Sequence, residues 1–158
     1  MKTSIREIFP RFYTPEQVDP CVRYIGHLDR MLVDDGTYYV EEDETGLIAC
    51  GGWSRRYKLY AGSGSADEDD RVLEPASEAA RVRAMFVRGD RTRRGLGTRI
   101  LATCAAAAKA EGFRRLILMA TLPGLQLYSA WGFELVEEVD IPLEDGTLVA
   151  GARMEKAV

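Results

Sequence analysis

The sequence predicts one domain of the α/β class, of the mixed α+β kind, in which helices flank a central mixed, mostly antiparallel sheet. Apolar residues at helical spacing occupy the first quarter of the chain. Strand-like runs then follow around turn residues, and one alanine-rich helical segment stands between two buried strand-like runs. No repeat or boundary divides the chain, so we expect a single domain over residues 1–158.

The N-terminal region predicts short helices. Ser4–Phe9 forms a first helix that ends at Pro10. Thr14–Gln17 is typical of a helix start, with a threonine N-cap, a proline in the first turn and a glutamine that closes a capping box. A third short helix is expected around residues 28–32.

The middle of the chain predicts a hairpin and a long loop. Tyr38–Glu42 and Gly46–Trp53 form the hairpin strands, with the turn at residues 43–45. Residues 60–80 are rich in glycine, serine and acidic residues and predict a mobile acidic loop. A sharper hypothesis is that its carboxylates attract a cationic substrate.

The second half of the chain alternates strands and helices. An alanine-rich helix has a natural end at Gly112. The predicted elements are a strand at 81–87, a helix at 97–111, a strand at 113–120, a short helix at 125–131 and a terminal hairpin of 133–141 and 148–154.

The segment Arg88–Thr98 is the most informative part of the chain, because it joins a strand to a helix through a basic, glycine-containing loop. Backbone N–H groups at a helix start, together with the helix dipole, bind anions, and Arg93 and Arg94 add cationic donors. Two common phosphate loops do not fit. Thr98 stands where the P-loop has lysine, and Ile100 where the dinucleotide fingerprint has glycine.

The loop resembles the acyl-CoA pyrophosphate loop of the GNAT superfamily of N-acetyltransferases, whose pattern is [Gln/Arg]-x-x-Gly-x-[Gly/Ala]. Here it reads Thr92–Gly97, with threonine at the position of the usual glutamine or arginine. A second signature of the family, Asn-x-x-Ala-x-x-hydrophobic-Tyr-x-x-x-Gly-Phe, is similar to Thr121–Phe133. Thr121 and Gly124 depart from it, and the tyrosine falls on Tyr128.

The resemblance implies the GNAT fold, with acetyl-CoA as cosubstrate and no metal. Main-chain groups of residues 85–87 would pair with the pantetheine arm, and the N–H groups of residues 93–98 would hold the pyrophosphate. The N–H of Phe86 or of Val87 would stabilise the oxyanion. The residues implied for acetyl-CoA are Met85, Phe86, Val87, Arg93, Arg94, Gly95, Leu96, Gly97, Thr98 and Thr121.

Tyr128 stands at the catalytic tyrosine position of the family, which implies a general acid that protonates the departing thiolate. The implied reaction is transfer of an acetyl group to a primary amine by direct attack in a ternary complex. The alternatives are a non-catalytic CoA-binding module of the same fold and a nucleotide- or RNA-binding α/β domain.

The sequence gives less information about the acceptor half of the reaction than about the donor half. The sequence does not identify the general base. Glu41, Glu42 and Glu78 are candidates, and each is equally well a solvated carboxylate at a strand edge. The resemblance also allows an ordered water with no single base. The acceptor, a small molecule or peptide amine, would lie across the sheet from CoA. The aromatic candidates for lining its site are Tyr13, Trp53, Tyr57 and Tyr60, although packing is the commoner role for each residue.

The family fold opens with a strand that Met1–Ile5 is too short to supply, so this strand is either missing or a stub. A missing edge strand exposes part of the sheet, which a partner chain could cover, and homodimers are frequent in the superfamily.

Composition limits the other classes of function. The net charge is −4 and the pI is near 5.2, which argues against a nucleic-acid binder. Three dispersed cysteines predict neither disulfides nor a zinc site, with Cys50 and Cys104 read as core residues. His27 is expected to be a surface residue. The sequence has no membrane-spanning stretch and no signal-peptide pattern, so we expect a cytoplasmic protein without membrane partners.

Overall fold

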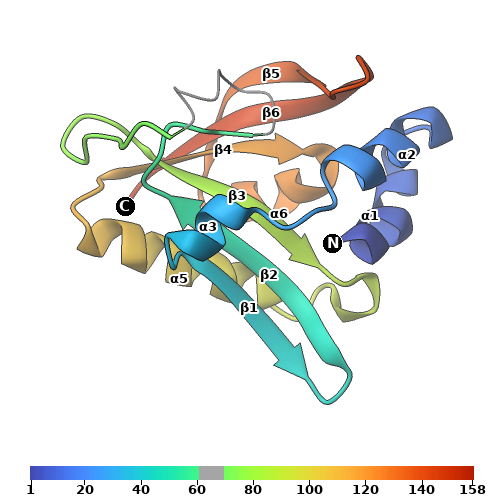
Figure 1. Ribbon diagram of the computed structural model, residues 1–158, viewed down its shortest axis with the longest axis horizontal. Coiled ribbons are helices and arrows are strands. Elements are labelled where there is room, and N and C mark those ends of the chain that lie inside the picture. Colours follow the sequence, from blue (N-terminus) through green and yellow to red (C-terminus); the bar gives the residue numbers. More distant parts are fainter. Residues whose placement is uncertain (61–69) are drawn as a thin grey trace.

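The computed structural model describes residues 1–60 and 70–158, and it contains a six-stranded sheet with helices on both faces (Figure 1). The predicted mixed fold class is confirmed. The elements, in order, are α1 (Lys2–Ile8), η1 (Phe9–Arg11), α2 (Pro15–Tyr24), α3 (Arg30–Asp34), β1 (Tyr38–Asp43), β2 (Gly46–Ser54), β3 (Ala80–Val87), η2 (Gly89–Arg91), α5 (Leu96–Ala110), β4 (Arg115–Thr121), η3 (Leu122–Gly124), α6 (Leu125–Ala130), β5 (Glu134–Pro142) and β6 (Leu148–Ala157).

The strands are arranged in the order β1-β2-β3-β4-β6-β5. Neighbours pair antiparallel everywhere except between β3 and β4. Residues 2–6, considered above as a strand stub, belong to the helix α1 and form no strand. β1 is therefore one edge of the sheet, and β5 is the other.

The parallel pair β3–β4 is short. It joins Ala80 to Leu116 and Arg81 to Ile117, and no later residues of β3 are paired with β4. The register between β2 and β3 shifts in the same region, because Cys50 lies opposite Phe86 whereas Gly52 lies opposite Arg83. One extra residue therefore stands in β3, and Ala84 has a φ of 54°. A β-bulge bends the strand that carries it, so β3 and β4 separate beyond Arg81.

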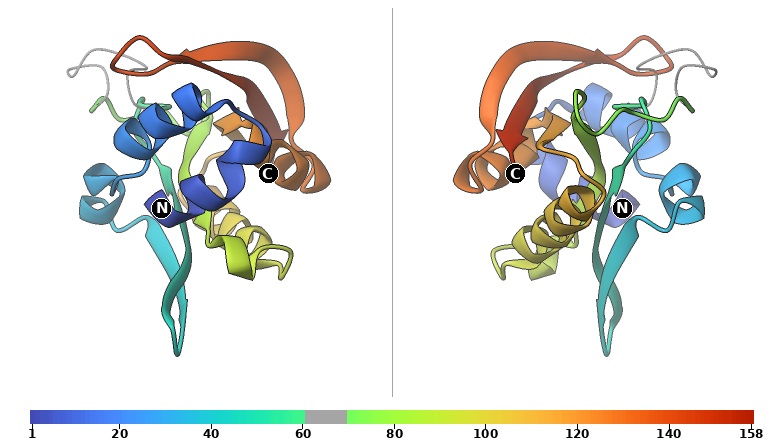
Figure 2. Two further views of the ribbon diagram at one scale, coloured as in Figure 1. Left: turned by 90° about the vertical axis from the view of Figure 1, so that its right-hand side faces the viewer. Right: turned by 90° about the vertical axis from the view of Figure 1, so that its left-hand side faces the viewer.

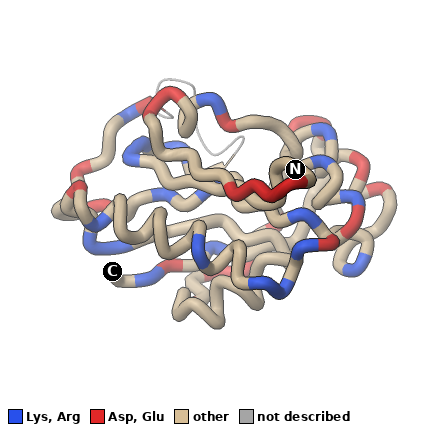
Figure 3. The backbone as a smooth tube through the Cα atoms, turned by 90° about the horizontal axis from the view of Figure 1, so that it is seen from below, with Lys and Arg blue, Asp and Glu red and all other residues tan. Residues whose placement is uncertain are grey.

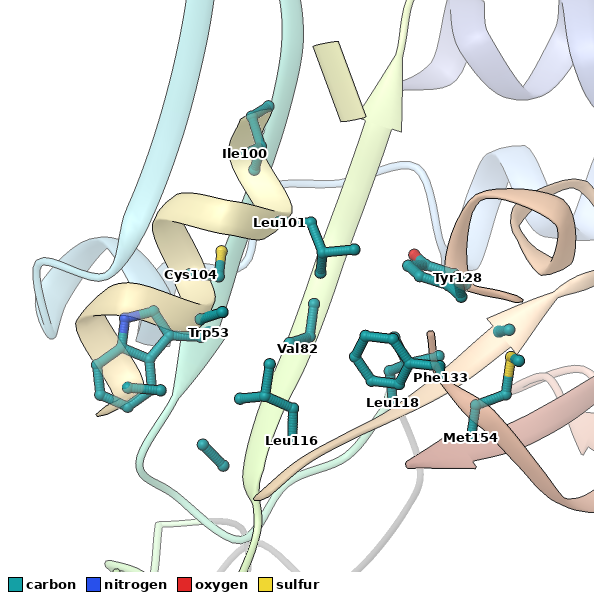
Figure 4. Packing of buried hydrophobic residues seen from close by; sticks show 14 of the residues in the cluster. Trp53, Val82, Ile100, Leu101, Cys104, Leu116, Leu118, Tyr128, Phe133 and Met154 are labelled. Carbon is teal, nitrogen blue, oxygen red and sulfur yellow. The ribbon is translucent and has the colours of Figure 1, made fainter. Parts of the chain in front are cut away.

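The helices form two layers around the sheet (Figure 2). α1, α2 and α3 lie on one face, and α5 lies on the other. Side chains of α5 such as Leu101 and Cys104 are fully buried against the strands, with Trp53 beside them (Figure 4). The Trp53 ring also packs edge-on against Phe113. The alanines of α5 bring the helix close to the sheet.

The N-terminal helices form a second core with the end of the sheet. Ile5, Phe9 and Val22 pack there against Ile141 and Val149 of the terminal hairpin. The predicted capping box is confirmed, with the Thr14 N–H donating to Gln17 Oε1 at 3.1 Å.

Part of the predicted acidic loop, residues 61–69, lies outside the described residues. The hypothesis that its carboxylates attract a substrate therefore stays a prediction. The end of the segment is well packed, with Leu73 only 2% exposed. In the part of the chain that the structure describes, no helix has the length and hydropathy that a membrane crossing requires.

Candidate active site

A cavity of about 1060 Å³ opens where β3 and β4 separate. At one end it is bounded by the loop before α5 and by α6, and at the other end by α1 and by the segment leading into α3. It therefore passes from the α5 side of the sheet to the side of the N-terminal helices. Residues of the predicted site that line it are Met85, Phe86, Val87, Arg93, Gly95, Leu96, Gly97, Thr98, Thr121 and Tyr128.

The loop before α5 turns sharply into the N-terminus of the helix. Gly95 is its N-cap in the left-handed region, with a φ of 77°, and Arg93 before it has a φ of 64°. The first backbone bond of the helix runs from the Arg99 N–H to the Gly95 carbonyl at 3.0 Å. Among the described residues, no acceptor faces the N–H groups of residues 93–98. These groups and the helix dipole favour a negatively charged ligand.

The structure distinguishes two arginines that the sequence treated alike. Arg93 lines the cavity and donates to Gln126 Oε1 of α6 at 2.9 Å. Arg94 is exposed on the outside of the loop and does not line the cavity. Arg93 is therefore the arginine placed to reach a ligand within the cavity.

The other arginines around the loop are paired with carboxylates. Arg88 bonds Asp90, Arg91 bonds Asp43, and Arg99 bonds Glu41. Basic and acidic positions are accordingly interspersed over the face seen in Figure 3. The positive charge of these three arginines is thus largely neutralised by neighbouring carboxylates.

The end of β3 presents main-chain groups to the cavity. The Arg88 N–H donates to Ile48 of β2 at 2.9 Å. Because main-chain groups alternate along a strand, those of Val87 point away from β2. The Ser4 hydroxyl donates to the Val87 carbonyl at 2.6 Å, which agrees with that direction. Of the two N–H groups that the sequence left open, this geometry favours Val87 over Phe86.

Tyr128 lies in α6 with its ring buried, edge-on to Phe133 at a centroid distance of 5.9 Å. A Cβ at Gly124 would lie 2.7 Å from the tyrosine ring, so glycine at this position lets the ring approach the backbone. No described residue bonds the Tyr128 hydroxyl. Burial raises the pKa of this phenol above its ordinary value, so it remains protonated at neutral pH.

The three carboxylates proposed as general bases do not line the cavity. Glu41 receives two bonds from Arg99, at 2.9 and 2.6 Å, on the side of β1 that faces α5. Glu42 is exposed. Glu78 receives two bonds from Arg71, at 2.9 and 2.7 Å. None of the three is therefore placed to act directly on a ligand in this cavity.

Glu78 instead predicts an acid dependence of stability. The Arg71 guanidinium, followed by the Glu74 N–H, lowers the Glu78 pKa from 4.5 to about 2. A carboxyl group with a lowered folded-state pKa stabilises the protein above pH 4.5, and this contribution is lost as the pH falls towards 2. We expect Glu78→Gln to reduce the fall in unfolding free energy over this range, as measured by urea unfolding at several pH values.

The matched control for this prediction is Glu42→Gln, which removes an exposed carboxylate of the same kind. If the unfolding free energy of Glu78→Gln falls with pH as steeply as that of the parent protein, the assignment of this acid dependence to Glu78 is contradicted.

Three of the four aromatic residues expected around the acceptor have other roles. Trp53 is 1% exposed in the core under α5. The Tyr13 hydroxyl donates to the Ala150 carbonyl and accepts from the Leu122 N–H. Tyr57 lines a second cavity of about 510 Å³ and has the guanidinium groups of Arg71 and Arg81 over its ring. Tyr60 alone of the four lines the large cavity.

Sequence reasoning missed several charged residues that line the large cavity, among them Asp29 and Arg83. They lie 54 residues apart in the chain and meet at 3.2 Å. No local motif marks either residue. His27, expected at the surface, is exposed and lies at the same end of the cavity.

The cysteines form no disulfide. Cys21 and Cys104 are buried, and Cys50 is half-buried with its thiol 3.9 Å from the Ala84 carbonyl. Within residues 1–60 and 70–158, no group of three or more histidine, cysteine or carboxylate side chains could hold a metal ion.

Several solved structures share this fold over nearly the whole chain. A GCN5-related N-acetyltransferase from Rhodopseudomonas palustris matches with a TM-score of 0.71 at 14% identity, covering 99% of this chain and 84% of that chain. The PaiA N-acetyltransferase from Thermoplasma acidophilum, solved in complex with coenzyme A, matches with a TM-score of 0.65 at 13% identity, covering 99% and 87%. A ribosomal-protein-alanine N-acetyltransferase from Brucella melitensis matches with a TM-score of 0.57 at 15% identity, covering 80% and 72%.

At these identities the structural matches establish the fold alone. No curated protein matches the sequence significantly. The sequence model of the acetyltransferase (GNAT) family matches residues 2–133, which is most of the chain and includes both the α5 loop and Tyr128. The chain therefore belongs to the GNAT family, whose members are acyl-CoA-dependent acetyltransferases.

Proposed function

We propose that the protein transfers an acetyl group from acetyl-CoA to a primary amine by direct attack within a ternary complex. The observation that carries this proposal is the cavity between β3 and β4, which connects the N-terminus of α5 with the N-terminal helices. A cavity that runs through the opening in the sheet has room for a donor at one end and an acceptor at the other.

The donor is proposed to lie with its pyrophosphate on the N–H groups of residues 93–98 and on Arg93. Its pantetheine arm would run along the free edge of β3, with Thr121 at the end of β4 near its path. The coenzyme A complex of the PaiA N-acetyltransferase, which has the same fold, supports this assignment.

At the reacting carbon, the Val87 N–H is proposed to stabilise the oxyanion that forms when the amine nitrogen attacks the thioester carbonyl. The carbon–sulfur bond then breaks, and the thiolate takes a proton from the Tyr128 hydroxyl. The proton lost by the amine leaves through water. The phenol is suited to this role because burial keeps it protonated.

The test is product formation. With acetyl-CoA and a panel of primary amines, we expect release of CoA together with an N-acetylated product detected by mass spectrometry. Initial rates at varied concentrations of both substrates should give intersecting double-reciprocal lines. Parallel lines would contradict direct attack, and CoA binding without turnover of any amine would instead favour a non-catalytic module.

Arg93 supplies a sharper test of the donor site. We expect Arg93→Ala to weaken acetyl-CoA binding about tenfold, which corresponds to about 1.4 kcal/mol, because the variant loses a charged donor inside the cavity. Isothermal titration calorimetry measures the change. Arg94→Ala is the matched control and should lose less affinity, since Arg94 lies outside the cavity. Equal losses in the two variants would contradict the assignment.

Two further properties stay predictions. We propose a cytoplasmic location and a homodimer in which a second chain covers the unpaired edge of β1. Size-exclusion chromatography with light scattering gives the oligomeric state.

A further inference from the structure

Asp29 and Arg83 form an ion pair at the acceptor end of the cavity. Asp29 is the N-cap residue of α3, and Arg83 precedes the bulge residue Ala84 in β3. Both residues line the cavity, and Arg83 Nη2 lies 3.2 Å from Asp29 Oδ2. The pair thus joins the acceptor-side helices to the strand that borders the reacting centre.

The surroundings of Arg83 make this a costly place for a charge. Its side chain is 4% exposed, against 22% for that of Asp29. The guanidinium donates to the Lys58 carbonyl at 3.0 Å and lies 3.5 Å from the sulfur of Met31. Burying a guanidinium and a carboxylate costs free energy that their mutual attraction only partly offsets, so stability alone is a weak reason for the pair.

The balance of charge at this end of the cavity restricts the acceptor. Asp29 is the one carboxylate among the described residues that line the cavity, whereas Arg30, Lys58 and Arg83 at this end are cationic. A purely cationic acceptor such as a polyamine would meet one attracting group and three repelling ones. A molecule with an ammonium group and a carboxylate could satisfy both members of the Asp29–Arg83 pair.

The remaining walls at this end are largely apolar. They include Phe9, Ile25, Leu28, Met31 and Met119. Such walls favour an acceptor whose body is apolar beyond its two charged groups.

We propose that the acceptor is an α-amino acid with an apolar side chain, whose ammonium group is bound by Asp29 and whose carboxylate is bound by Arg83. This inference rests on the proposed acetyl transfer and names the substrate class for the same cavity. In the absence of the acceptor, the two side chains satisfy each other. Arg83 and Asp29 are then determinants of specificity for the amine.

The experiment compares amino acids with their decarboxylated counterparts, after calorimetry has established acetyl-CoA binding. L-leucine is paired with 3-methylbutylamine and L-phenylalanine with 2-phenylethylamine, and spermidine is the polycationic probe. We expect kcat/KM to be at least tenfold higher for each amino acid than for its decarboxylated partner, with spermidine a poor substrate.

Variants separate recognition from folding. Arg83→Gln should bring the ratio of kcat/KM between L-leucine and 3-methylbutylamine close to one, whereas a merely structural role would lower both values together. Asp29→Asn should raise the KM of both amines about tenfold while leaving the KM of acetyl-CoA unchanged. Asp34→Asn, on the exposed end of the same helix, is the matched control. If Arg83→Gln does not fold, the proposal is tested by the ratio of kcat/KM between each amino acid and its decarboxylated partner, measured with the parent protein.

The outcomes distinguish the two levels of the proposal. A preference for the decarboxylated amines or spermidine overturns the amino-acid inference and leaves acetyl transfer standing. Acetyl-CoA binding without turnover of any probe overturns the inference and leaves the donor site intact. Absence of acetyl-CoA binding overturns the proposed function, and the inference with it.

Discussion

Replacing Tyr128 with phenylalanine is expected to lower kcat for acetyl transfer about 100-fold at neutral pH, at the lower end of the range for loss of a general acid. The change removes only the hydroxyl, which no described residue bonds, and keeps the ring that packs on Phe133. The Kd for acetyl-CoA should therefore remain close to that of the parent protein. Steady-state kinetics and calorimetry on the same preparation measure the two quantities.

The pH dependence supplies a second readout for Tyr128. A general acid must be protonated, so its contribution is lost as the pH rises through its pKa. Because burial raises the Tyr128 pKa, we expect no loss of kcat from this group between pH 7 and about pH 9. Tyr57→Phe, which removes a hydroxyl outside the large cavity, is the control. An unchanged kcat in Tyr128→Phe would exclude the phenol as the acid.

Replacing Trp53 with alanine is expected to lower the unfolding free energy by about 3–5 kcal/mol, the range for removal of a large buried aromatic side chain. Trp53 is 1% exposed and packs edge-on against Phe113, with Arg55 over its ring at 5.5 Å. Its removal leaves a cavity between α5 and the sheet that the surrounding helix and strands can only partly fill. Urea unfolding followed by circular dichroism measures the loss.

The same experiment distinguishes a core role of Trp53 from a role in binding the acceptor. Leu47→Ala removes an exposed side chain of the same strand and should change the unfolding free energy by less than about 0.5 kcal/mol. If Trp53→Ala kept its stability and instead lost amine specificity, the core assignment would be contradicted. Trp53 would then belong to the acceptor site, as the sequence suggested.

The donor half of the site could be predicted from the sequence because its signals are local. Glycines at 95 and 97 mark the loop, and the alanine run after them marks a helix that the structure extends over Leu96–Ala110. The strand expected at 81–87 is observed as Ala80–Val87. Turn chemistry, helix propensity and strand composition act over a few residues, so they can be read without tertiary structure.

The acceptor half depends on contacts that are distant in the chain. The bulge at Ala84 has no sequence signal, because an alanine with positive φ is set by the surrounding sheet. Trp53 follows Gly51 and Gly52, so the sequence lacks the alternation of apolar and polar side chains that would indicate on which face of the sheet Trp53 lies. The pairing of Asp29 with Arg83 similarly emerges only when the start of α3 comes close to β3 in the folded chain.

The most direct test of the central claim is calorimetric titration of acetyl-CoA into the protein, with ATP and NAD as controls. We predict a single site with a Kd in the micromolar range for acetyl-CoA, weakened in Arg93→Ala, and no comparable binding of ATP or NAD. Equal affinity for all three ligands would indicate a general anion site at α5. No binding of acetyl-CoA would contradict the assignment of the cavity between β3 and β4 as an acyl-CoA site.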